Sequence, residues 1–256
     1  MRIAVAGGTG WVGKHVVDEV RAGGHDPVVL ARSTGVDLTT GRGLEDALRG
    51  VSRVIDVSNL TTTSRKRSVT FFDTGSRNLL EAGRKAGIEH HVALSIVGCT
   101  RVDLGYYFGK RRQEERVLAS GLPATVLRST QFHEFAAQML GFHGKGGPLA
   151  LTPRMRSQPI AAKEVATTLV DLALGPALGM APELAGPEQR EMTAMVRQLK
   201  LVSGCRKVVI PVRLPGAVGR SMTGGGLLPQ KEGPRGRQTF DEWVAEFAAA
   251  PSEPPR

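Results

Sequence analysis

The stretch that decides the fold of this chain is Gly7-Gly8-Thr9-Gly10-Trp11-Val12-Gly13. It lies between an apolar run at residues 3–6, which predicts a buried strand, and a helix-length segment at residues 11–22. Glycines at its first, fourth and last positions allow a tight turn, close approach of backbone N–H groups to phosphate, and close packing of the helix on the strand. The stretch therefore predicts a turn that binds the pyrophosphate of a dinucleotide. The residues expected to contact the cofactor there are Gly7, Thr9, Gly10, Trp11, Val12 and Gly13.

Strand-like apolar runs alternate with helix-length segments through the first half of the chain. This alternation is typical of βαβ units and predicts an α/β fold, a Rossmann-type doubly wound parallel sheet. The expected strands are residues 3–6, 27–31, 54–57, 91–95 and 124–128, and the expected helices are residues 11–22, 43–48, 68–86 and 107–119. Because ligands of such sheets bind at the carboxyl ends of the strands, we expect the site residues just after each strand.

Glycine and proline become frequent beyond about residue 144, and the alternation weakens. We expect one NAD(P)-binding domain, in which residues 1–143 form the dinucleotide-binding core and residues 144–250 form a small C-terminal substrate-binding lobe. Helices are expected at 162–174, 192–202 and 239–249, and a strand at 207–212. The proline-rich residues 251–256 are expected to be a disordered tail.

Length and composition fit a globular chain with a sizeable core: 256 residues, of which 41% are hydrophobic and 23% charged. The two cysteines, Cys99 and Cys205, are too few for a disulfide framework, so a cytoplasmic location is expected. No apolar stretch is long enough for a signal peptide or a membrane span, and no membrane partner is expected.

The formal net charge of +10 requires an explanation. Nucleic-acid-binding proteins usually gather Lys and Arg on one face, whereas here short basic runs such as Arg65-Lys66-Arg67, Arg111-Arg112 and Arg206-Lys207 are spread along the chain. Aromatic residues make up 5% of the chain, which leaves few for stacking on bases. The charge therefore indicates a solvated basic surface that favours an anionic cofactor or substrate, and nucleic acid is not expected as a partner. No spacing of Cys, His, Asp or Glu predicts a metal site.

The end of the second expected strand distinguishes between the two nicotinamide cofactors. NAD binders tend to place an acid there for the ribose 2′-hydroxyl, whereas NADP binders accommodate the 2′-phosphate with an Arg. This chain has Arg32, whose planar guanidinium suits a phosphate, and Ser33, which can add a hydroxyl donor. Asp37 is the alternative, NAD-type acid, but Thr34-Gly35 already begins a turn before it. NADP(H) is therefore expected in preference to NAD(H).

Several further stretches, taken in order with the glycine turn, resemble the short-chain dehydrogenase/reductase superfamily. They are Val36-Asp37-Leu38, Val57-Ser58-Asn59, Val92-Ala93-Leu94-Ser95-Ile96-Val97-Gly98, Tyr106-Tyr107-Phe108-Gly109-Lys110 and Leu127-Arg128-Ser129-Thr130-Gln131-Phe132. The chain looks closest to the atypical, NmrA-like branch, which includes quinone and dye reductases, and the resemblance covers about residues 1–200.

This resemblance implies roles for residues on both sides of the cofactor. Asp37 and Leu38 would meet the adenine, and Ser58 and Asn59 would lie under the adenine ribose. The stretch that ends at Phe132 would border the nicotinamide. Because Gln131, Phe132 and His133 follow a strand, they are expected in the substrate pocket. His133 could serve acid–base chemistry there, or simply line the pocket.

The resemblance also implies a catalytic set of Ser95, Tyr106 and Lys110. Tyr106 and Lys110 are four residues apart at the start of an expected helix, and so share one face. A lysine ammonium beside a phenol would lower the phenol pKa, and the phenol could donate a proton to a carbonyl oxygen as hydride arrives from the cofactor. Lys110 could also hold the nicotinamide ribose, and Ser95 could donate a hydrogen bond to the same carbonyl oxygen.

Two departures from the family pattern leave this catalytic set open. The family strand often ends in paired serines, and Ile96 takes the second place here. If that second serine is the one that acts, Ser95 faces the wrong side of its strand, because neighbours along a strand face opposite ways. Tyr107 also competes with Tyr106, although only Tyr106 has the spacing to Lys110.

Together these features favour an NADPH-dependent oxidoreductase that reduces a small carbonyl, quinone or similar small-molecule acceptor by hydride transfer. One alternative is an NmrA-like regulator that senses the dinucleotide without turning it over. Another is a redox-neutral enzyme on the same fold. A monomer and a homodimer are both compatible with the sequence.

Overall fold

The computed structural model describes residues 1–141 and 147–249, so the predicted tail at 251–256 lies outside the described residues. Its main feature is a six-stranded sheet of order β2-β1-β3-β4-β5-β8, whose paired strands run parallel. The strands are β1 (Arg2–Ala6), β2 (Asp26–Leu30), β3 (Arg53–Asp56), β4 (His90–Ile96), β5 (Ala124–Ser129) and β8 (Gly179–Met180). The chain passes from β1 to β2 on one side and then to β3 on the other. This reversal confirms the predicted Rossmann-type, doubly wound fold.

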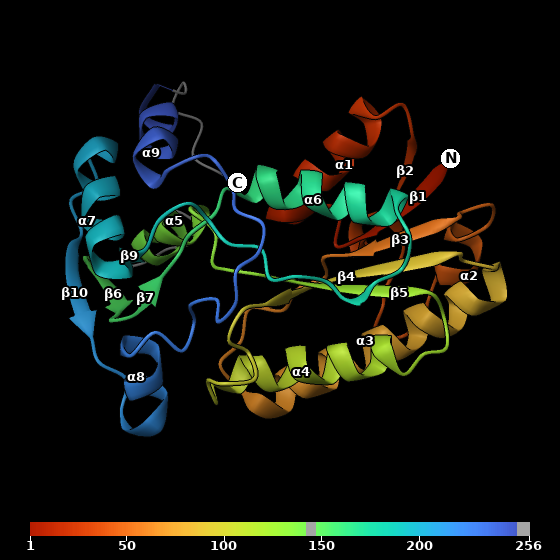
Figure 1. The fold of residues 1–256 in the computed structure, drawn as a ribbon, viewed down its shortest axis with the longest axis horizontal. Coiled ribbons are helices and arrows are strands. Elements are labelled where there is room, and N and C mark those ends of the chain that lie inside the picture. Colours follow the sequence, from red (N-terminus) through yellow and green to blue (C-terminus); the bar gives the residue numbers. More distant parts are fainter. Residues whose placement is uncertain (142–146, 250–256) are drawn as a thin grey trace. The chain divides into compact units, whose positions relative to one another are not determined.

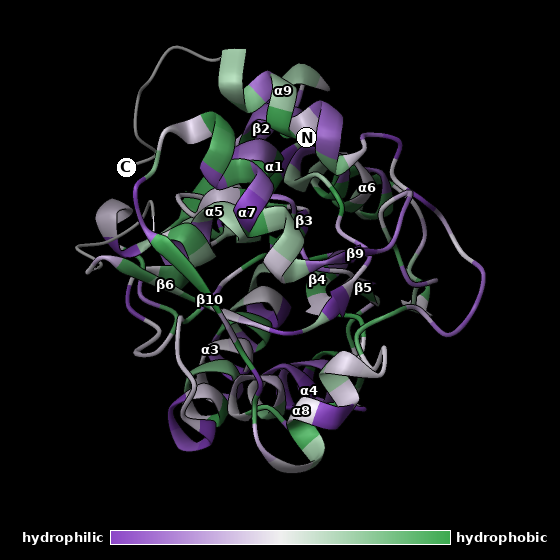
Figure 2. Cartoon of the chain, turned by 90° about the vertical axis from the view of Figure 1, so that its left-hand side faces the viewer, coloured by the Kyte–Doolittle hydropathy of each residue, from purple (hydrophilic) through white to green (hydrophobic). Residues whose placement is uncertain are grey.

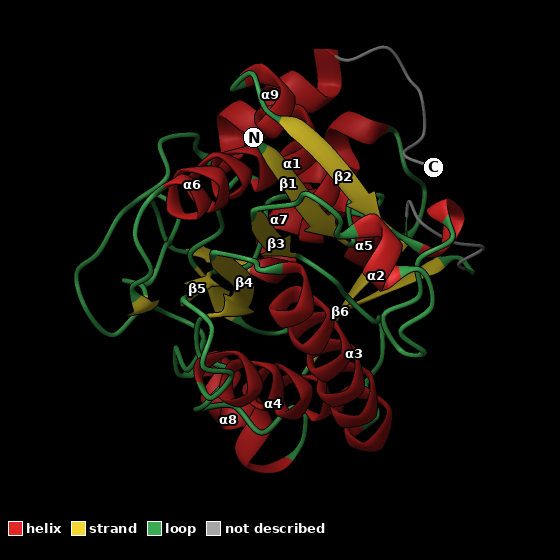
Figure 3. Ribbon diagram, turned by 90° about the vertical axis from the view of Figure 1, so that its right-hand side faces the viewer, coloured by secondary structure: helices red, strands yellow, loops and turns green. Residues whose placement is uncertain are grey.

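Helices cover both faces of this sheet (Figures 1 and 3). One face carries α1 (Trp11–Ala22) and α6 (Ala162–Leu174), and the other carries α3 (Arg65–Ala86) and α4 (Gly105–Leu118). The short helix α2 (Leu44–Ala47) packs against α3, and a 3-10 turn, η1 (Arg32–Thr34), follows β2. No described helix is long and apolar enough to cross a membrane.

Alternation along β4 decides which side chains meet α4. Ala93 packs with Leu80 of α3 and Val117 of α4, so it faces that pair of helices. The odd-numbered neighbours of Ala93 share its face, because side chains in a strand alternate. His90 faces the other way and lies 2.9 Å from the Thr125 hydroxyl. Ser95 therefore projects toward α4.

The chain divides into two compact units that interleave in sequence. The first comprises Met1–Arg128 and Lys163–Pro182, and the second comprises Ser129–Ala162 and Glu183–Arg256. The second contains α5 (Glu134–Leu140), β6 (Leu149–Pro153), β7 (Arg156–Ser157), β9 (Arg190–Glu191), α7 (Met192–Ser203), β10 (Val208–Val212), α8 (Gly216–Thr223) and α9 (Phe240–Ala249). In it β6 pairs with β10 in parallel and β7 pairs with β9 antiparallel. The expected division at residue 143 therefore differs from the observed one, and substrate binding by residues 144–250 stays a prediction.

Five elements of the second unit were not predicted, namely α5, β6, β7, β9 and α8. Each is short or lies among glycines and prolines, where local sequence patterns are weak. In the first unit, α4 begins at Gly105, two residues earlier than predicted. A Cβ at Gly105 would stand 2.1 Å from the Thr63 carbonyl oxygen, so this glycine lets the start of α4 approach the segment before α3.

Candidate functional site

The glycine turn after β1 has the geometry of a phosphate cradle. Gly7 has a φ of +79°, and a Cβ there would stand 2.9 Å from the Ser58 Cα. A Cβ at Gly13 would stand 2.1 Å from the Gly7 carbonyl oxygen. Gly10 caps α1 without any side-chain hydrogen bond, and the N-terminus of a helix at such a turn favours an anion. Since a Cβ would fill this cradle, the turn fits a pyrophosphate.

The other predicted residues of the turn surround this cradle. Thr9 and Trp11 are exposed, whereas Val12 is buried beneath the first turn of α1. Gly10 N donates to the Gly7 carbonyl oxygen at 2.9 Å, which closes the turn. The cradle is therefore set by the backbone, with side chains at its rim.

The end of β2 presents an unpaired cation. Arg32 and Ser33 are exposed in the 3-10 turn η1, and the Arg32 side chain has no ion-pair partner among the described residues. The Asp37 carboxylate accepts hydrogen bonds from Thr39 N at 2.8 Å and from Thr39 Oγ1 at 2.7 Å. These bonds lower the pKa of Asp37. Arg32 is thus free to meet an anion, whereas Asp37 is already engaged within its own turn.

The end of β3 carries the two residues predicted under the ribose. Ser58 is buried and its N–H donates to Asp56 Oδ1 at 2.9 Å. Asn59 is exposed, and its Oδ1 accepts from Leu60 N at 2.8 Å. The Leu38 carbonyl oxygen is held by Asn78 of α3 at 2.8 Å. A pocket of about 380 Å³ opens beside these segments, lined by Thr39, Leu60, Lys66, Arg67, Thr70, Phe71 and Thr74.

Tyr106 reaches toward this end of β3 from the first turn of α4. Its hydroxyl donates to Asn59 Oδ1 at 2.6 Å. Its carbonyl oxygen accepts from Ser68 Oγ of α3 at 2.7 Å, which fixes the backbone at this position. Burial raises the pKa of Tyr106, and the neighbouring Tyr107 phenol adds to the effect. Tyr106 therefore lies beside one of the predicted cofactor residues.

Lys110 does not pair with Tyr106. It is buried, and its Nζ donates to the Leu94 carbonyl oxygen at 2.5 Å and to Gln113 Oε1. Burial lowers the pKa of Lys110 to about 8, although the Asp56 carboxylate favours its charged form. The prediction that Lys110 lowers the pKa of Tyr106 is therefore wrong for this conformation, because the ammonium is directed to other acceptors.

A hydrogen-bonded relay nevertheless connects Lys110 with the end of β3. Gln113 accepts from Lys110 and donates through Nε2 to Asp56 Oδ2 at 2.8 Å. The other oxygen of Asp56 holds the Ser58 N–H. Sequence reasoning missed Gln113 and Asp56. Their positions, one turn after Lys110 and at the end of a buried strand, are the signals that could have identified them.

Ser95 belongs to a separate buried cluster. Its hydroxyl donates to Glu114 Oε1 at 2.5 Å, and Glu114 Oε2 pairs with Arg128 at 2.6 Å. The Cys99 thiol lies 3.4 Å from Glu114 Oε1, and burial raises its pKa to about 11, as expected of a structural thiol. The structure thus gives Ser95, Tyr106 and Lys110 three different partners. Ser95 projects toward α4 and bonds to Glu114 there, and its role beside a substrate stays a prediction.

The predicted pocket residues belong to the second unit. His133 is fully buried, its Nε2 lies 3.0 Å from the Gln238 carbonyl oxygen, and its ring lies 5.5 Å from that of Phe240. Gln131 Oε1 accepts from Ser157 Oγ at 3.0 Å. Phe132 is half-buried. These contacts give His133 a place in the core of that unit, and the role of the three residues toward a substrate stays a prediction.

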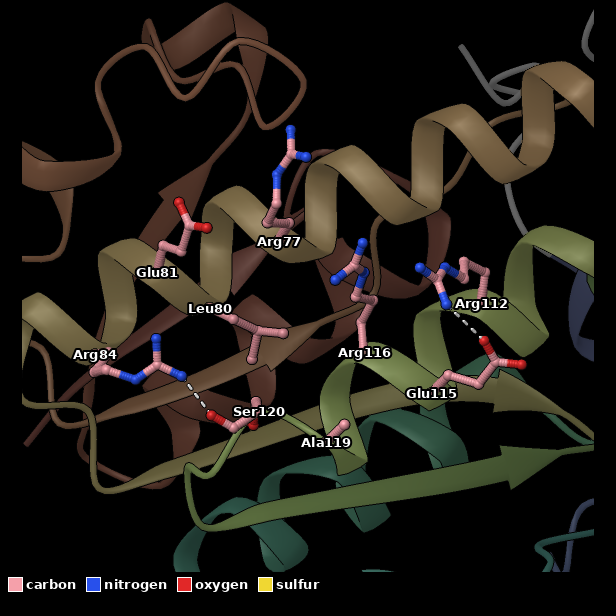
Figure 4. A pocket seen from close by; sticks show the side chains of 9 residues that line it. All are labelled: Arg77, Leu80, Glu81, Arg84, Arg112, Glu115, Arg116, Ala119 and Ser120. Atoms are coloured by element: carbon pink, nitrogen blue, oxygen red, sulfur yellow. Dashed lines mark hydrogen bonds and ion pairs between the residues drawn. The ribbon is translucent and has the colours of Figure 1, made fainter.

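Another pocket lies between α3 and α4 (Figure 4). It has a volume of about 310 Å³, and none of the predicted site residues lines it. Arginine and glutamate side chains dominate the lining, which consists of Arg77, Leu80, Glu81, Arg84, Arg112, Glu115, Arg116, Ala119 and Ser120. The described residues contain no group of three His, Cys, Asp or Glu that could hold a metal ion.

Two sequence comparisons match the N-terminal part of the chain. Residues 3–99 match the model of the NAD-dependent epimerase/dehydratase family. The photosystem II assembly factor Ycf39 of Synechocystis sp. is 32% identical over 147 residues, which are 52% of this chain and 45% of that protein. The match thus spans about half the length of this curated relative.

Solved structures resemble the chain over nearly its whole length. A short-chain dehydrogenase/reductase superfamily protein from Agrobacterium tumefaciens with bound NAD has a TM-score of 0.70 and 19% identity, and the match covers 97% of this chain and 96% of that chain. An NADPH-dependent quinone oxidoreductase from Escherichia coli, complexed with NADPH, has a TM-score of 0.69 and 18% identity, with 96% and 99% covered. At these identities the likeness establishes the fold.

Proposed function

We propose, on the premise that this chain belongs to the short-chain dehydrogenase/reductase superfamily, that it is an NADPH-dependent oxidoreductase. Its acceptor is a small carbonyl, quinone or similar compound, reduced by hydride transfer. The observation that carries the proposal is the pairing of a backbone phosphate cradle at Gly7–Gly13 with the unpaired, exposed Arg32 at the end of β2.

The cofactor preference rests on the contrast between Arg32 and Asp37. A 2′-phosphate needs a cation with free donors, which Arg32 offers. An NAD-type ribose would need a carboxylate directed at its hydroxyls, whereas Asp37 is held within its own turn by two hydrogen bonds from Thr39 to Oδ1. The NAD-bound and NADPH-bound structural neighbours show that the fold accommodates either cofactor, so this local contrast supports NADPH.

Tyr106 is the residue we assign to proton donation. NADPH, when bound, supplies the hydride. The Tyr106 O–H can donate its proton to the carbonyl oxygen as that oxygen gains negative charge. Burial keeps the pKa of this phenol high, so the hydroxyl is protonated over the working pH range, as an acid in a reduction must be. To reach a substrate, the hydroxyl exchanges its bond to Asn59 for one to the carbonyl oxygen.

The role of Lys110 is a second assignment within this proposal. Its Nζ would turn from the Leu94 carbonyl oxygen toward the ribose hydroxyls of the nicotinamide. The pKa of about 8 leaves the ammonium largely charged at neutral pH, so it can donate such bonds. Ser95 is assigned to positioning Glu114, since the pair is already bonded in the buried cluster with Arg128.

A regulator that senses the dinucleotide without catalysis is the second candidate. Two hydrogen bonds favour it. Lys110 donates to the Leu94 carbonyl oxygen and Ser95 donates to Glu114, so neither side chain is directed to Tyr106. A redox-neutral reaction is a third candidate, in keeping with the epimerase/dehydratase family that residues 3–99 match. Product formation without net consumption of NADPH would identify the redox-neutral reaction, and cofactor-dependent binding of a protein partner would identify the regulator.

The first test is a side-by-side titration of the protein with NADPH and NADH, followed by cofactor fluorescence. We expect clearly tighter binding of NADPH, and we expect the Arg32→Asp variant to lose that preference while the matched surface variant Arg49→Asp keeps it. Equal or tighter NADH binding would refute the assignment of Arg32 and turn attention to Asp37. NADPH consumption with a panel of quinones and carbonyls then separates the enzyme from the regulator.

A further inference from the structure

The small parallel sheet of the second unit is made of apolar strands, and Figure 2 colours β6 and β10 largely as hydrophobic. Leu149 and Leu151 of β6 lie opposite Val208 and Ile210 of β10. Their exposed fractions are 49%, 61%, 55% and 36%, whereas the alternate residues of β6 are buried. We call these four side chains the β6–β10 face. Alternation therefore places four aliphatic side chains together in solvent, on a sheet whose other face packs on α5 and α7.

Cations without acidic neighbours in sequence flank this face. Residues 147–162 and 192–231, which include both strands, contain nine Lys and Arg residues and no Asp or Glu. Arg206 precedes β10, while Arg154 and Arg213 follow β6 and β10. All three are exposed and form no ion pair among the described residues. At their carboxyl ends the two strands stay hydrogen-bonded to each other, because Arg154 N donates to the Val212 carbonyl oxygen at 2.8 Å.

We propose that the β6–β10 face docks on an anionic lipid surface. Aliphatic side chains at such a surface enter the boundary between headgroups and acyl chains, and Lys or Arg beside them attract the anionic headgroups. Leu151 and Ile210 lie at the centre of the face, Arg206 is in phase with Val208 and Ile210 two residues before β10, and Arg154 and Arg213 are exposed just after the carboxyl ends of the two strands. The proposal does not rest on the proposed function.

Charge and composition favour lipid over the other occupants. A second copy of this chain would bring like charges together across the interface, which opposes self-association. A nucleic acid would meet no aromatic side chain on this face and gain nothing from four aliphatic ones. No membrane partner was expected from the sequence, because no apolar stretch is long enough for a signal peptide or a membrane span. A docking face made by two strands almost 60 positions apart in sequence leaves no such signal.

The test is sedimentation of the full chain with vesicles of phosphatidylcholine alone and with about 30% phosphatidylglycerol. We expect binding to the anionic vesicles alone, weakened by added salt. Each of Arg154→Gln, Arg206→Gln and Arg213→Gln should weaken partitioning about fivefold, and the pair Leu151→Gln with Ile210→Gln about tenfold. The matched controls are Arg77→Gln and Leu118→Gln, an exposed cation and an exposed leucine of the first unit.

Folding and other partners are checked on the same variants. Melting temperature and NADPH affinity should match those of the unmodified chain, so that lost vesicle binding is not lost structure. Failure to bind anionic vesicles, or equal weakening by the control variants, would overturn the proposal. So would a dimer that the Leu151 and Ile210 changes dissolve, which would assign the face to a second copy. Binding to duplex DNA that needs the three arginines but neither apolar residue would also overturn it.

Discussion

The turn after β1 and the first turns of α4 are two parts of one predicted site, yet they are built differently. The turn acts through its backbone: a Cβ at Gly13 would stand 2.1 Å from the Gly7 carbonyl oxygen. The α4 residues act through side chains, and Tyr106 and Lys110 are directed to Asn59 and Leu94. A glycine spacing thus predicts a conformation by itself, whereas a Tyr-x-x-x-Lys spacing predicts only that two side chains share a helix face.

The strongest challenge to this comparison is the Tyr106→Phe variant. If Tyr106 donates the proton, turnover should fall by about 10²–10⁴-fold, while NADPH affinity stays nearly constant. Steady-state kinetics and cofactor titration measure the two effects separately. Tyr107→Phe is the matched control and should keep most of the activity. Full activity of the Tyr106→Phe variant would mean that the hydroxyl bonded to Asn59 has no part in the chemistry.

The turn itself can be broken by adding one methyl group. Gly13→Ala should displace the backbone of Gly7 and lower the free energy of unfolding by roughly 2 kcal/mol, with at least about a tenfold loss of NADPH affinity. Denaturant unfolding and fluorescence titration measure both. Gly23→Ala is the control, since its added Cβ meets only ordinary contacts of 3.4 Å or more. Normal NADPH binding by the Gly13→Ala variant would contradict a backbone-built cradle.

Lys110 in α4 makes the free energy of unfolding depend on pH, which the backbone-built turn does not. Its pKa falls from 10.5 to about 8 in the folded chain, so the native state binds fewer protons than the unfolded state between these values. This contribution to the free energy of unfolding is present above pH 10.5 and is lost as the pH falls through about 8. The difference is roughly 3 kcal/mol. Lys110→Met should remove this rise in urea unfolding curves, and the surface variant Lys231→Met should keep it.

Ser95→Ala should have the smallest effect on activity. The loss of a hydrogen bond to Glu114 should lower the free energy of unfolding by about 1–2 kcal/mol, with turnover within about twofold. Ser76→Ala is a matched change, because its buried hydroxyl has no hydrogen-bond partner among the described residues. Calorimetry and kinetics distinguish the outcomes. A hundredfold loss of turnover with normal stability would restore Ser95 to the catalytic set.

The predictable features are those that the backbone and local pattern determine. The order of strands and helices up to β5 and the bounds of α1 followed from apolar runs and glycines. The direction of Ser95 did not, because its face depends on Ala93 meeting Leu80 and Val117. The ion pair of Glu114 and Arg128 was also missed, since nothing local marks two charges on neighbouring elements as partners.

The interleaving of the two units bears on how the chain folds as it is made. The polypeptide leaves the first unit at Arg128 and returns to it only for Lys163–Pro182, which holds most of α6 and the edge strand β8. During synthesis, the first unit therefore cannot complete its sheet until residue 182 has left the ribosome. Residues Ser129–Ala162 of the second unit cannot pack fully until the rest of that unit, which begins at Glu183, has also been synthesised. Truncation after residue 128 is then expected to leave a sheet without its last strand, with the side of β5 that pairs with β8 uncovered.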